Sequence, residues 1–154
     1  MVGRVLLAVA FSLAAFSPTA VSADPGSDVA ITATPCQFNP EIGPWFASGA
    51  ITDSGTYART ETVVSPPNRP MFSPVNLHET FVFTGSHGTF TIEANEQPAP
   101  DGTVGVWNIR PEGSGAYADM NGHGESAFSG SPTPSCAGGF TITLVFTGGV
   151  TKVG

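Results

Sequence analysis

The chain is poor in charged residues, and most of the charge it carries is negative. Only 11% of its 154 residues are Asp, Glu, Lys or Arg, against roughly 25% in average proteins. Twelve acidic residues stand against five basic ones, which gives a formal net charge of −7. A nucleic-acid-binding protein needs a basic surface, and this composition cannot supply one. Nucleic acid is therefore excluded as a partner.

Helix-forming residues are also scarce. After residue 23, leucine occurs only at Leu77 and Leu144, and the chain has a single lysine, Lys152. No segment repeats apolar residues at the helical period, which excludes a helical bundle. Disorder is excluded as well, because 40% of the residues are hydrophobic and 11 are Phe. The 19 Gly and 14 Pro make about 21% of the chain, where roughly 12% is usual, and favour a turn-rich all-β protein.

Residues 1–23 predict a secretory signal peptide. Arg4 supplies the positive start, Val5–Phe16 is an apolar run, and Val21-Ser22-Ala23 places small residues before a cleavage site. The run is shorter than the roughly 20 residues that span a bilayer. We therefore expect cleavage after Ala23, an extracellular location, and a single exported domain over residues 24–154 without a membrane span.

The chain has two cysteines, Cys36 and Cys136. Cysteines of an exported protein meet an oxidising compartment, where an intramolecular disulfide is the simplest outcome. Free buried thiols and an intermolecular bond are the alternatives. An intramolecular bond would bring the first strand of the mature chain close to the last.

Eight segments alternate apolar and polar residues or are rich in β-branched residues, and turn residues separate them. The clearest is Phe140–Thr147, where aromatic and aliphatic residues alternate with threonine and valine. The pattern predicts a single antiparallel β-barrel of about eight strands, with a two-sheet β-sandwich as the alternative. The predicted strands are Val29–Gln37, Trp45–Ile51, Thr56–Val64, Glu79–Thr84, Thr89–Asn95, Thr103–Arg110, Glu125–Phe128 and Phe140–Thr147.

Three other patterns give local predictions. Asp53-Ser54-Gly55 is a turn signal, and Ser65–Pro74 holds four prolines and predicts a long loop. Strict alternation through Thr56–Val64 would place Tyr57, Arg59, Glu61 and Val63 on one face. The glycines of Gly113–Gly124 predict a loop.

The stretch His87–Phe128 resembles the allene-oxide-cyclase-like β-barrel proteins, including small exported bacterial members. The resemblance rests on Gly88–Ile92 (Gly-Thr-Phe-Thr-Ile), on Trp107–Ile109 and on the Gly-x-Tyr-x-x-Met-x-Gly-x-Gly run that ends at Gly124. Met120 stands where the family pattern usually has leucine. The resemblance implies a β-barrel and, for the enzymes of the superfamily, cyclisation of a fatty-acid-derived epoxide. No motif of this chain carries catalytic residues over from that family.

The glycine-rich run also has a physical interpretation without the family. Tyr117 and Met120 are three residues apart, which is the spacing of one short helical turn. Both side chains are large and mostly apolar. We predict that they plug one end of the barrel.

Candidate chemistry is sparse. The histidines at 78, 87 and 123 lie in no metal-ligand spacing, so neither a metal nor another cofactor is predicted. Glutamates 61, 79 and 93 lie in predicted strands, where arginines 59 and 110 are potential partners and outward-facing charge is the commoner arrangement. The candidate ligand-binding residues are those expected to line the interior of the barrel: Phe81, Phe83, Phe90, Trp107, Phe146, Arg59 and Glu61.

These observations favour an exported protein that binds a small apolar molecule or a surface partner without catalysing a reaction. One alternative is an isomerase or cyclase that acts on a lipid-like substrate inside the barrel. Another is a structural or interaction module of the cell envelope. We regard an enzymatic role as less favoured, because no catalytic motif accompanies the fold.

Overall fold

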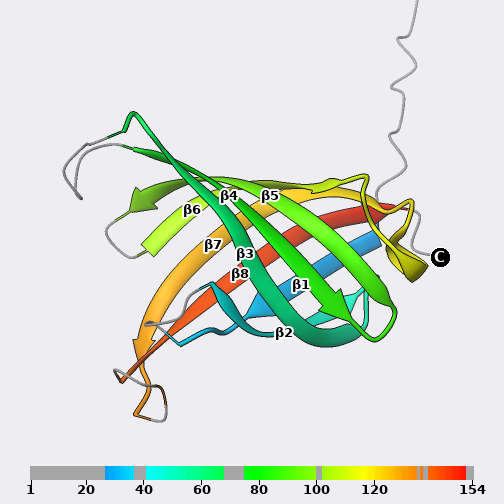
Figure 1. Cartoon of the computed structure of the whole chain (residues 1–154), viewed down its shortest axis with the longest axis horizontal. Coiled ribbons are helices and arrows are strands. Elements are labelled where there is room, and N and C mark those ends of the chain that lie inside the picture. The colour runs from blue at the N-terminus through cyan, green and yellow to red at the C-terminus, as the bar shows by residue number, and fades with distance from the viewer. Residues whose placement is uncertain are drawn as a thin grey trace, which may run out of the picture.

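The computed structural model describes residues 27–36, 41–67, 75–99, 102–134, 136 and 139–151. The predicted signal peptide lies outside the described residues, as does the 68–74 part of the predicted Ser65–Pro74 loop. Eight antiparallel strands follow one another around a closed barrel (Figure 1). The strands are β1 (Ser27–Ala33), β2 (Ile42–Gly49), β3 (Asp53–Ser65), β4 (Asn76–Gly85), β5 (Gly88–Ala99), β6 (Gly102–Arg110), β7 (Asn121–Pro132) and β8 (Phe140–Thr151).

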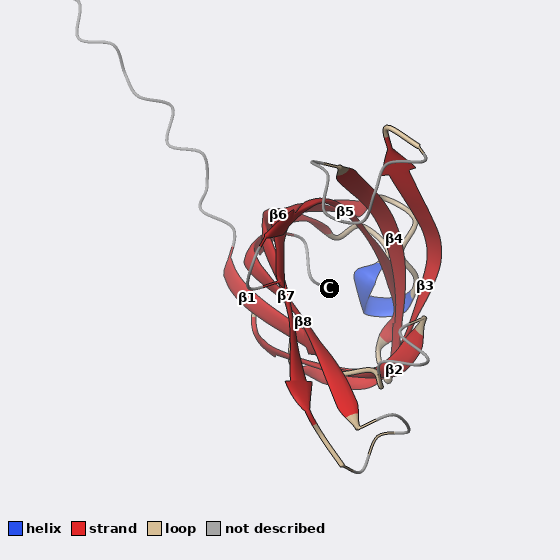
Figure 2. Ribbon diagram, turned by 90° about the vertical axis from the view of Figure 1, so that its left-hand side faces the viewer, coloured by secondary structure: helices blue, strands red, loops and turns tan. Residues whose placement is uncertain are grey.

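The first and last strands close the barrel. β1 pairs with β2 on one side and with β8 on the other, in a register that places Ile31 opposite Phe146. Every other strand pairs with its neighbours in sequence, so the strands form one continuous ring (Figure 2). The predicted barrel is confirmed, and the sandwich alternative is excluded. In the described part of the chain, no helix is long and apolar enough to cross a membrane.

The predicted disulfide is confirmed. Cys36 and Cys136 are bonded, with their Cα atoms 5.4 Å apart and a sequence separation of 100. Cys36 also forms an isolated bridge with Thr141 of β8. The bond therefore sits beside the seam where the two ends of the barrel sheet meet.

Several glycines that predicted turns lie inside strands. Asp53-Ser54-Gly55 begins β3, and Gly122 and Gly124 lie in β7, so both turn predictions are wrong at these positions. Gly55 and Gly124 occupy these strand positions because tryptophan side chains need the space beside them. Trp45 is paired with Gly55, which is paired in turn with Gly85. The indole Nε1 of Trp45 donates a hydrogen bond to the carbonyl oxygen of Thr84 at 3.1 Å.

The same arrangement occurs at a second place in the ring. Trp107 is paired with Gly124, which is paired with Gly148. Its Nε1 donates to the carbonyl oxygen of Thr147 at 3.1 Å. The glycines on the two strands beside each tryptophan have no side chain, so they leave room for the flat indole against the sheet. The glycine surplus thus serves the interior as well as the turns.

Aromatic rings fill the interior between the two tryptophans. Phe83 and Phe90 stack with ring centroids 5.0 Å apart, and Phe146 meets Phe83 edge to face at 5.8 Å. The side chains of Phe81, Phe83, Phe90 and Phe146 have no exposed surface. Burial of aromatic groups on this scale contributes much of the stability of a small domain.

β3 contains an irregularity that changes which side chains face inward. The register with β4 shifts between Arg59 and Glu61, so that Arg59 is opposite Phe81 and Glu61 is opposite Thr80. Such a bulge adds a residue and reverses the alternation beyond it. The predicted common face of Tyr57, Arg59, Glu61 and Val63 is therefore wrong: Tyr57 is buried, whereas Glu61 is exposed and Val63 is 47% exposed.

Candidate functional site

One end of the barrel is closed by the glycine-rich run. A 3-10 turn, η1 (Gly115–Tyr117), lies at this end (Figures 1 and 2). Tyr117 is 2% exposed and Met120 is 1% exposed. The Tyr117 ring meets Phe90 edge to face at 5.1 Å. The prediction that Tyr117 and Met120 plug the barrel is confirmed.

A buried carboxylate holds this closure in place. Asp53 accepts hydrogen bonds from the backbone N–H groups of Ser54, Ser86 and His87, from the Ser86 hydroxyl at 2.7 Å and from the Tyr117 hydroxyl at 2.8 Å. Burial alone raises the pKa of Asp53, but these hydrogen bonds outweigh it and hold the pKa far below its usual range. Burial and the Asp53 carboxylate raise the pKa of Tyr117. Asp53 thereby ties β3 and the β4–β5 turn to η1.

Asp53, Ser86 and His87 lie together without forming a nucleophilic triad. The Ser86 oxygen is 3.1 Å from Nδ1 of His87, but its hydroxyl proton is directed to Asp53. A serine nucleophile must instead pass its proton to the histidine, with the carboxylate on the far side of the ring. The cluster is built to close the barrel.

A second polar cluster lies inside the barrel, farther along the strands. Arg59 donates to Oε1 of Glu79 at 2.8 Å, and Thr62 donates to the same oxygen at 3.2 Å. Glu79 is 4% exposed. An ion pair this well covered by protein is costly to break from one side. The sequence predicts Arg59 as a potential partner of the glutamates in the strands, and in the structure its partner is Glu79.

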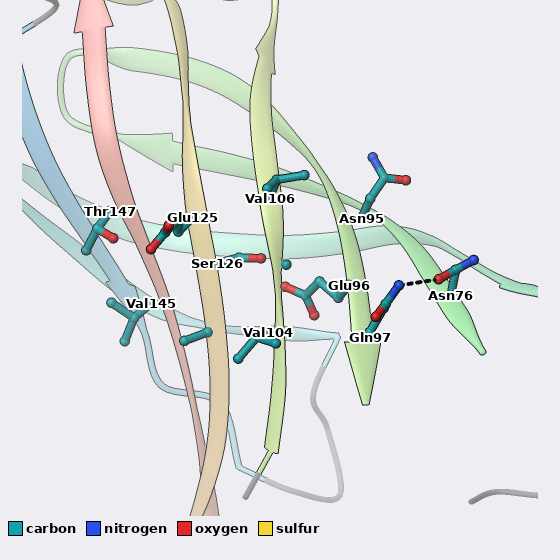
Figure 3. Close-up of a pocket in the computed structure, with 12 residues that line it drawn as sticks. Asn76, Asn95, Glu96, Gln97, Val104, Val106, Glu125, Ser126, Val145 and Thr147 are labelled. Carbon is teal, nitrogen blue, oxygen red and sulfur yellow. Dashed lines mark hydrogen bonds between the residues drawn. The ribbon is translucent and has the colours of Figure 1, made fainter. Parts of the chain in front are cut away.

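Glu96 is the most buried acid of this cluster, at 2% exposure. Thr103 donates to its Oε2 at 3.1 Å, whereas its Oε1 and the Oγ of Ser126 have no hydrogen-bond partner among the described residues. Glu96, Gly105 and Ser126 are side by side in the registers of β5, β6 and β7. Because Gly105 has no side chain, the other two point toward each other across it (Figure 3).

The environment of Glu96 favours its neutral form. Burial is the largest cause and raises the pKa of Glu96. The nearby Ser126 hydroxyl opposes this, the charge of Glu79 adds to it, and the bond from Thr103 opposes it by less, so that the pKa is raised overall. A carboxyl group whose pKa is raised on folding stabilises the protein fully below its unfolded pKa. That stabilisation is lost as pH rises through the folded value.

Glu96→Gln should therefore remove a loss of stability that begins as pH rises above the unfolded pKa of a glutamate, about 4.3. We expect the melting temperature of the wild type to fall relative to that of Glu96→Gln as pH rises from 5 to 9, and the two to converge toward pH 4. Thermal unfolding across this pH range measures the difference, with the exposed Glu41→Gln as the control for net charge. Parallel curves for the wild type and Glu96→Gln would contradict the assignment.

A hollow of about 820 Å³ lies over five neighbouring strands, β4 to β8, on the outside of the barrel (Figure 3). Val104 and Val106 of β6 are each 58% exposed in it. The side chains of Glu96 and Ser126 point inward, so these two residues contribute mainly backbone to the hollow. The residues that line the hollow are Asn76, Asn95, Glu96, Gln97, Val104, Gly105, Val106, Glu125, Ser126, Ala127, Val145 and Thr147.

Strand register arranges the outward side chains of the hollow in two rows. One row runs Gln97, Val104, Ala127 and Val145 across β5 to β8, and the other runs Asn95, Val106, Glu125 and Thr147. The first row is thus an amide followed by three aliphatic groups. Both rows begin with an amide on β5, where Nε2 of Gln97 also donates to Asn76 at 3.0 Å.

The predicted ligand-binding residues lie elsewhere. The four phenylalanines and Trp107 are packed ring to ring in the core, Arg59 is held by Glu79, and the bulge turns Glu61 to the outer face. None of the seven lines the hollow. A signal for the hollow was present in β6, where Val104 and Val106 alternate with Trp107, so that both faces of the strand are apolar.

Glu93 and Arg110 pair on the outer face of β5 and β6. Two nitrogens of Arg110 contact Oε1 of Glu93, and Nε2 of His78 lies 3.8 Å from the same oxygen. The hydrogen bond from Arg110, helped by Asn108, lowers the pKa of Glu93 despite partial burial. This pair is half-exposed, so solvent screens it and it contributes modestly to stability.

Among the described residues, no group of three or more His, Cys, Asp or Glu side chains could hold a metal ion. Comparisons of the chain with protein-family models, with curated proteins and with solved structures find no match. The resemblance to the allene-oxide-cyclase-like barrels therefore stays a prediction.

Proposed function

We propose that this protein is an exported, non-catalytic barrel that binds a small, mostly apolar molecule in the hollow over β4 to β8. The observation that carries the proposal is the exposed aliphatic surface of Val104, Val106, Ala127 and Val145 inside a concavity of about 820 Å³. Binding sites for small molecules commonly enclose roughly 300–1,000 Å³. The ring-filled interior supports a ligand outside the barrel.

The apolar character of the hollow is unusual for its position. The outward face of an antiparallel strand is commonly polar, and β8 carries threonines at 141, 143 and 147. Val104 and Val106 instead present aliphatic side chains to water at 58% exposure. Covering such surface releases about 25 cal/mol for each Å², so a ligand with an aliphatic body gains affinity there.

The predicted signal peptide and the disulfide support the exported setting. Disulfides persist mainly in oxidising compartments, and the bond between Cys36 and Cys136 leaves no free cysteine. A barrel stapled in this way suits a binding protein that works outside the cell.

Nile red, an uncharged apolar dye that fluoresces when removed from water, tests the hollow. We expect the wild type to bind the dye and Val106→Asp to weaken binding by about tenfold, because a carboxylate would replace aliphatic surface at the centre of the hollow. Phe46→Asp is the matched control, since Phe46 is 54% exposed on β2 and lies outside the hollow.

Equal dye binding by Val106→Asp and Phe46→Asp would overturn the proposal, as would the absence of binding by the wild type. Circular dichroism spectra and melting temperatures establish that both variants are folded. Mass spectrometry of the protein purified from its natural host would then identify the molecule that occupies the hollow.

The isomerase or cyclase alternative has one observation in its favour. Arg59, Glu79 and Glu96 bring a cation, a carboxylate and a carboxyl of raised pKa together inside the barrel, and such groups suit acid–base chemistry. Incubation of the protein with a fatty-acid-derived epoxide, followed by mass spectrometry and chiral chromatography of the product, tests it. Conversion by the wild type and loss with Glu96→Gln would favour the enzyme.

A further inference from the structure

We propose that the ligand of the hollow is a cationic amphiphile, whose ammonium group lies beside Glu125 and whose aliphatic body covers the valines. The inference rests on the proposed function and specifies its ligand. It follows from the charge of one side chain, from the lack of a compensating cation among the described residues that line the hollow, and from the order of residues in the two rows.

Glu125 is an exposed carboxylate that lacks a partner among the described residues. It lies on β7 between Val106 of β6 and Thr147 of β8. Among the described residues, none donates a hydrogen bond to its side chain or forms an ion pair with it. None of the described residues that line the hollow is Lys, Arg or His.

Two other outer-face glutamates, Glu93 and Glu61, differ in this respect. Glu93 is paired with Arg110, and Glu61 accepts a hydrogen bond from Thr80 at 3.5 Å. Glu125, the carboxylate that lies in the hollow, therefore has no ion-pair partner among the described residues. In a chain with a net charge of −7, such a position attracts a cation and repels an anionic head group.

The aliphatic surface begins next to this charge. In Figure 3, Glu125 and Thr147 lie on one side of the hollow, Asn95 and Gln97 lie on the other, and the valines of β6 lie between them. Neighbouring strands are about 4.8 Å apart, so the row from Val104 to Val145 gives an aliphatic track about 10 Å wide. A head group at Glu125 therefore leaves its chain directly on apolar surface.

Displacement of Nile red by three eight-carbon probes tests the inference. Octylamine is cationic at pH 7, octanol is neutral and octanoate is anionic, while their aliphatic bodies are alike. An exposed ion pair changes affinity by about threefold, and repulsion of like charge acts with similar size. We expect octylamine to bind about threefold more tightly than octanol and about tenfold more tightly than octanoate.

Glu125→Gln should abolish this order, so that octylamine and octanol compete equally. Glu41→Gln is the matched control, because Glu41 is an exposed acid next to β2 and the substitution changes the net charge by the same amount. The preference of the wild type for octylamine should also shrink in 1 M NaCl, where the Debye length is about 3 Å.

The outcomes separate the inference from the function on which it rests. If Nile red binds in a Val106-dependent way but the three probes compete equally, the hollow binds apolar molecules and the cationic ligand is wrong. A preference for octylamine that survives in Glu125→Gln would likewise overturn the role of Glu125. If Nile red does not bind, the proposed function itself fails.

Discussion

Replacing Cys36 and Cys136 together by alanine is expected to lower the free energy of unfolding by roughly 4 kcal/mol. The bond closes a loop of 100 residues, for which loss of chain entropy in the unfolded state gives about 4.7 kcal/mol, and measured values are often smaller. Small domains have net stabilities of roughly 5–15 kcal/mol. The variant should therefore unfold at a much lower urea concentration than the wild type.

The position of the bond adds a structural consequence. β1 and β8 meet at the seam of the barrel, and Cys36 lies directly beyond β1, where it pairs with Thr141. Hydrogen exchange should accelerate first in β1 and β8 of the variant, because the seam can then open locally. Wild-type protein in reductant should reproduce both effects, and an unchanged urea midpoint in either case would contradict the stabilising role of the bond.

Asp53→Asn is expected to cost about 3 kcal/mol at neutral pH. The carboxylate accepts five hydrogen bonds, and an amide has only one acceptor oxygen, while its NH₂ group would face N–H donors. Hydrogen bonds to a charged group are worth about 1.5–3 kcal/mol each, and unsatisfied buried donors add to the loss. The exposed Asp28→Asn on β1 is the control, with urea unfolding as the measurement.

Asp53 should also make the stability of the protein depend on pH in the acidic range. Folding lowers the pKa of Asp53, so its contribution is present above the unfolded pKa of about 3.9 and is lost as pH falls toward the lower folded value. The wild type should thus lose stability below about pH 4, and Asp53→Asn should lose less over the same range. The sign is opposite to that expected for Glu96, whose raised pKa removes stability as pH rises.

Two outcomes would contradict this account of Asp53. One is equal stability of Asp53→Asn and Asp28→Asn at pH 7. The other is an acid transition of the same size in Asp53→Asn and the wild type. Tyr117→Phe removes a single donor to the carboxylate, and we expect it to cost less than Asp53→Asn while leaving the acid transition in place.

Composition and alternation were sufficient to predict consecutive antiparallel strands, whereas the choice between a barrel and a two-sheet sandwich needed the structure. A chain with few helix formers, many threonines and regularly spaced turn residues has one way to bury its phenylalanines, which is on the inner face of consecutive antiparallel strands. The pairing of Cys36 with Cys136 was predicted as the simplest outcome for two cysteines in an oxidising compartment, and the structure excludes the alternatives. Tyr117 and Met120 were placed correctly because their spacing, three residues apart, is a local property.

Features that depend on contacts between distant strands could not be predicted in this way. Gly55 and Gly124 have the same local sequence character as turn glycines, and only the register with Trp45 and Trp107 gives them a role inside strands. The bulge after Arg59 likewise depends on how β3 fits β4, and it moves Glu61 to the outer face.

The candidate site was decided by the tertiary structure alone. The sequence supplied Val104, Val106 and Glu125 as ordinary strand residues, and alternation permits either face to be the inner one until the larger side chains are packed. Once Trp107 and Phe146 occupy the interior, those three side chains must face outward, and pairing across β5 to β8 brings them into one hollow. Alternation along the chain fixes which residues share a face, whereas volume and register decide which face is filled and which is left open for a ligand.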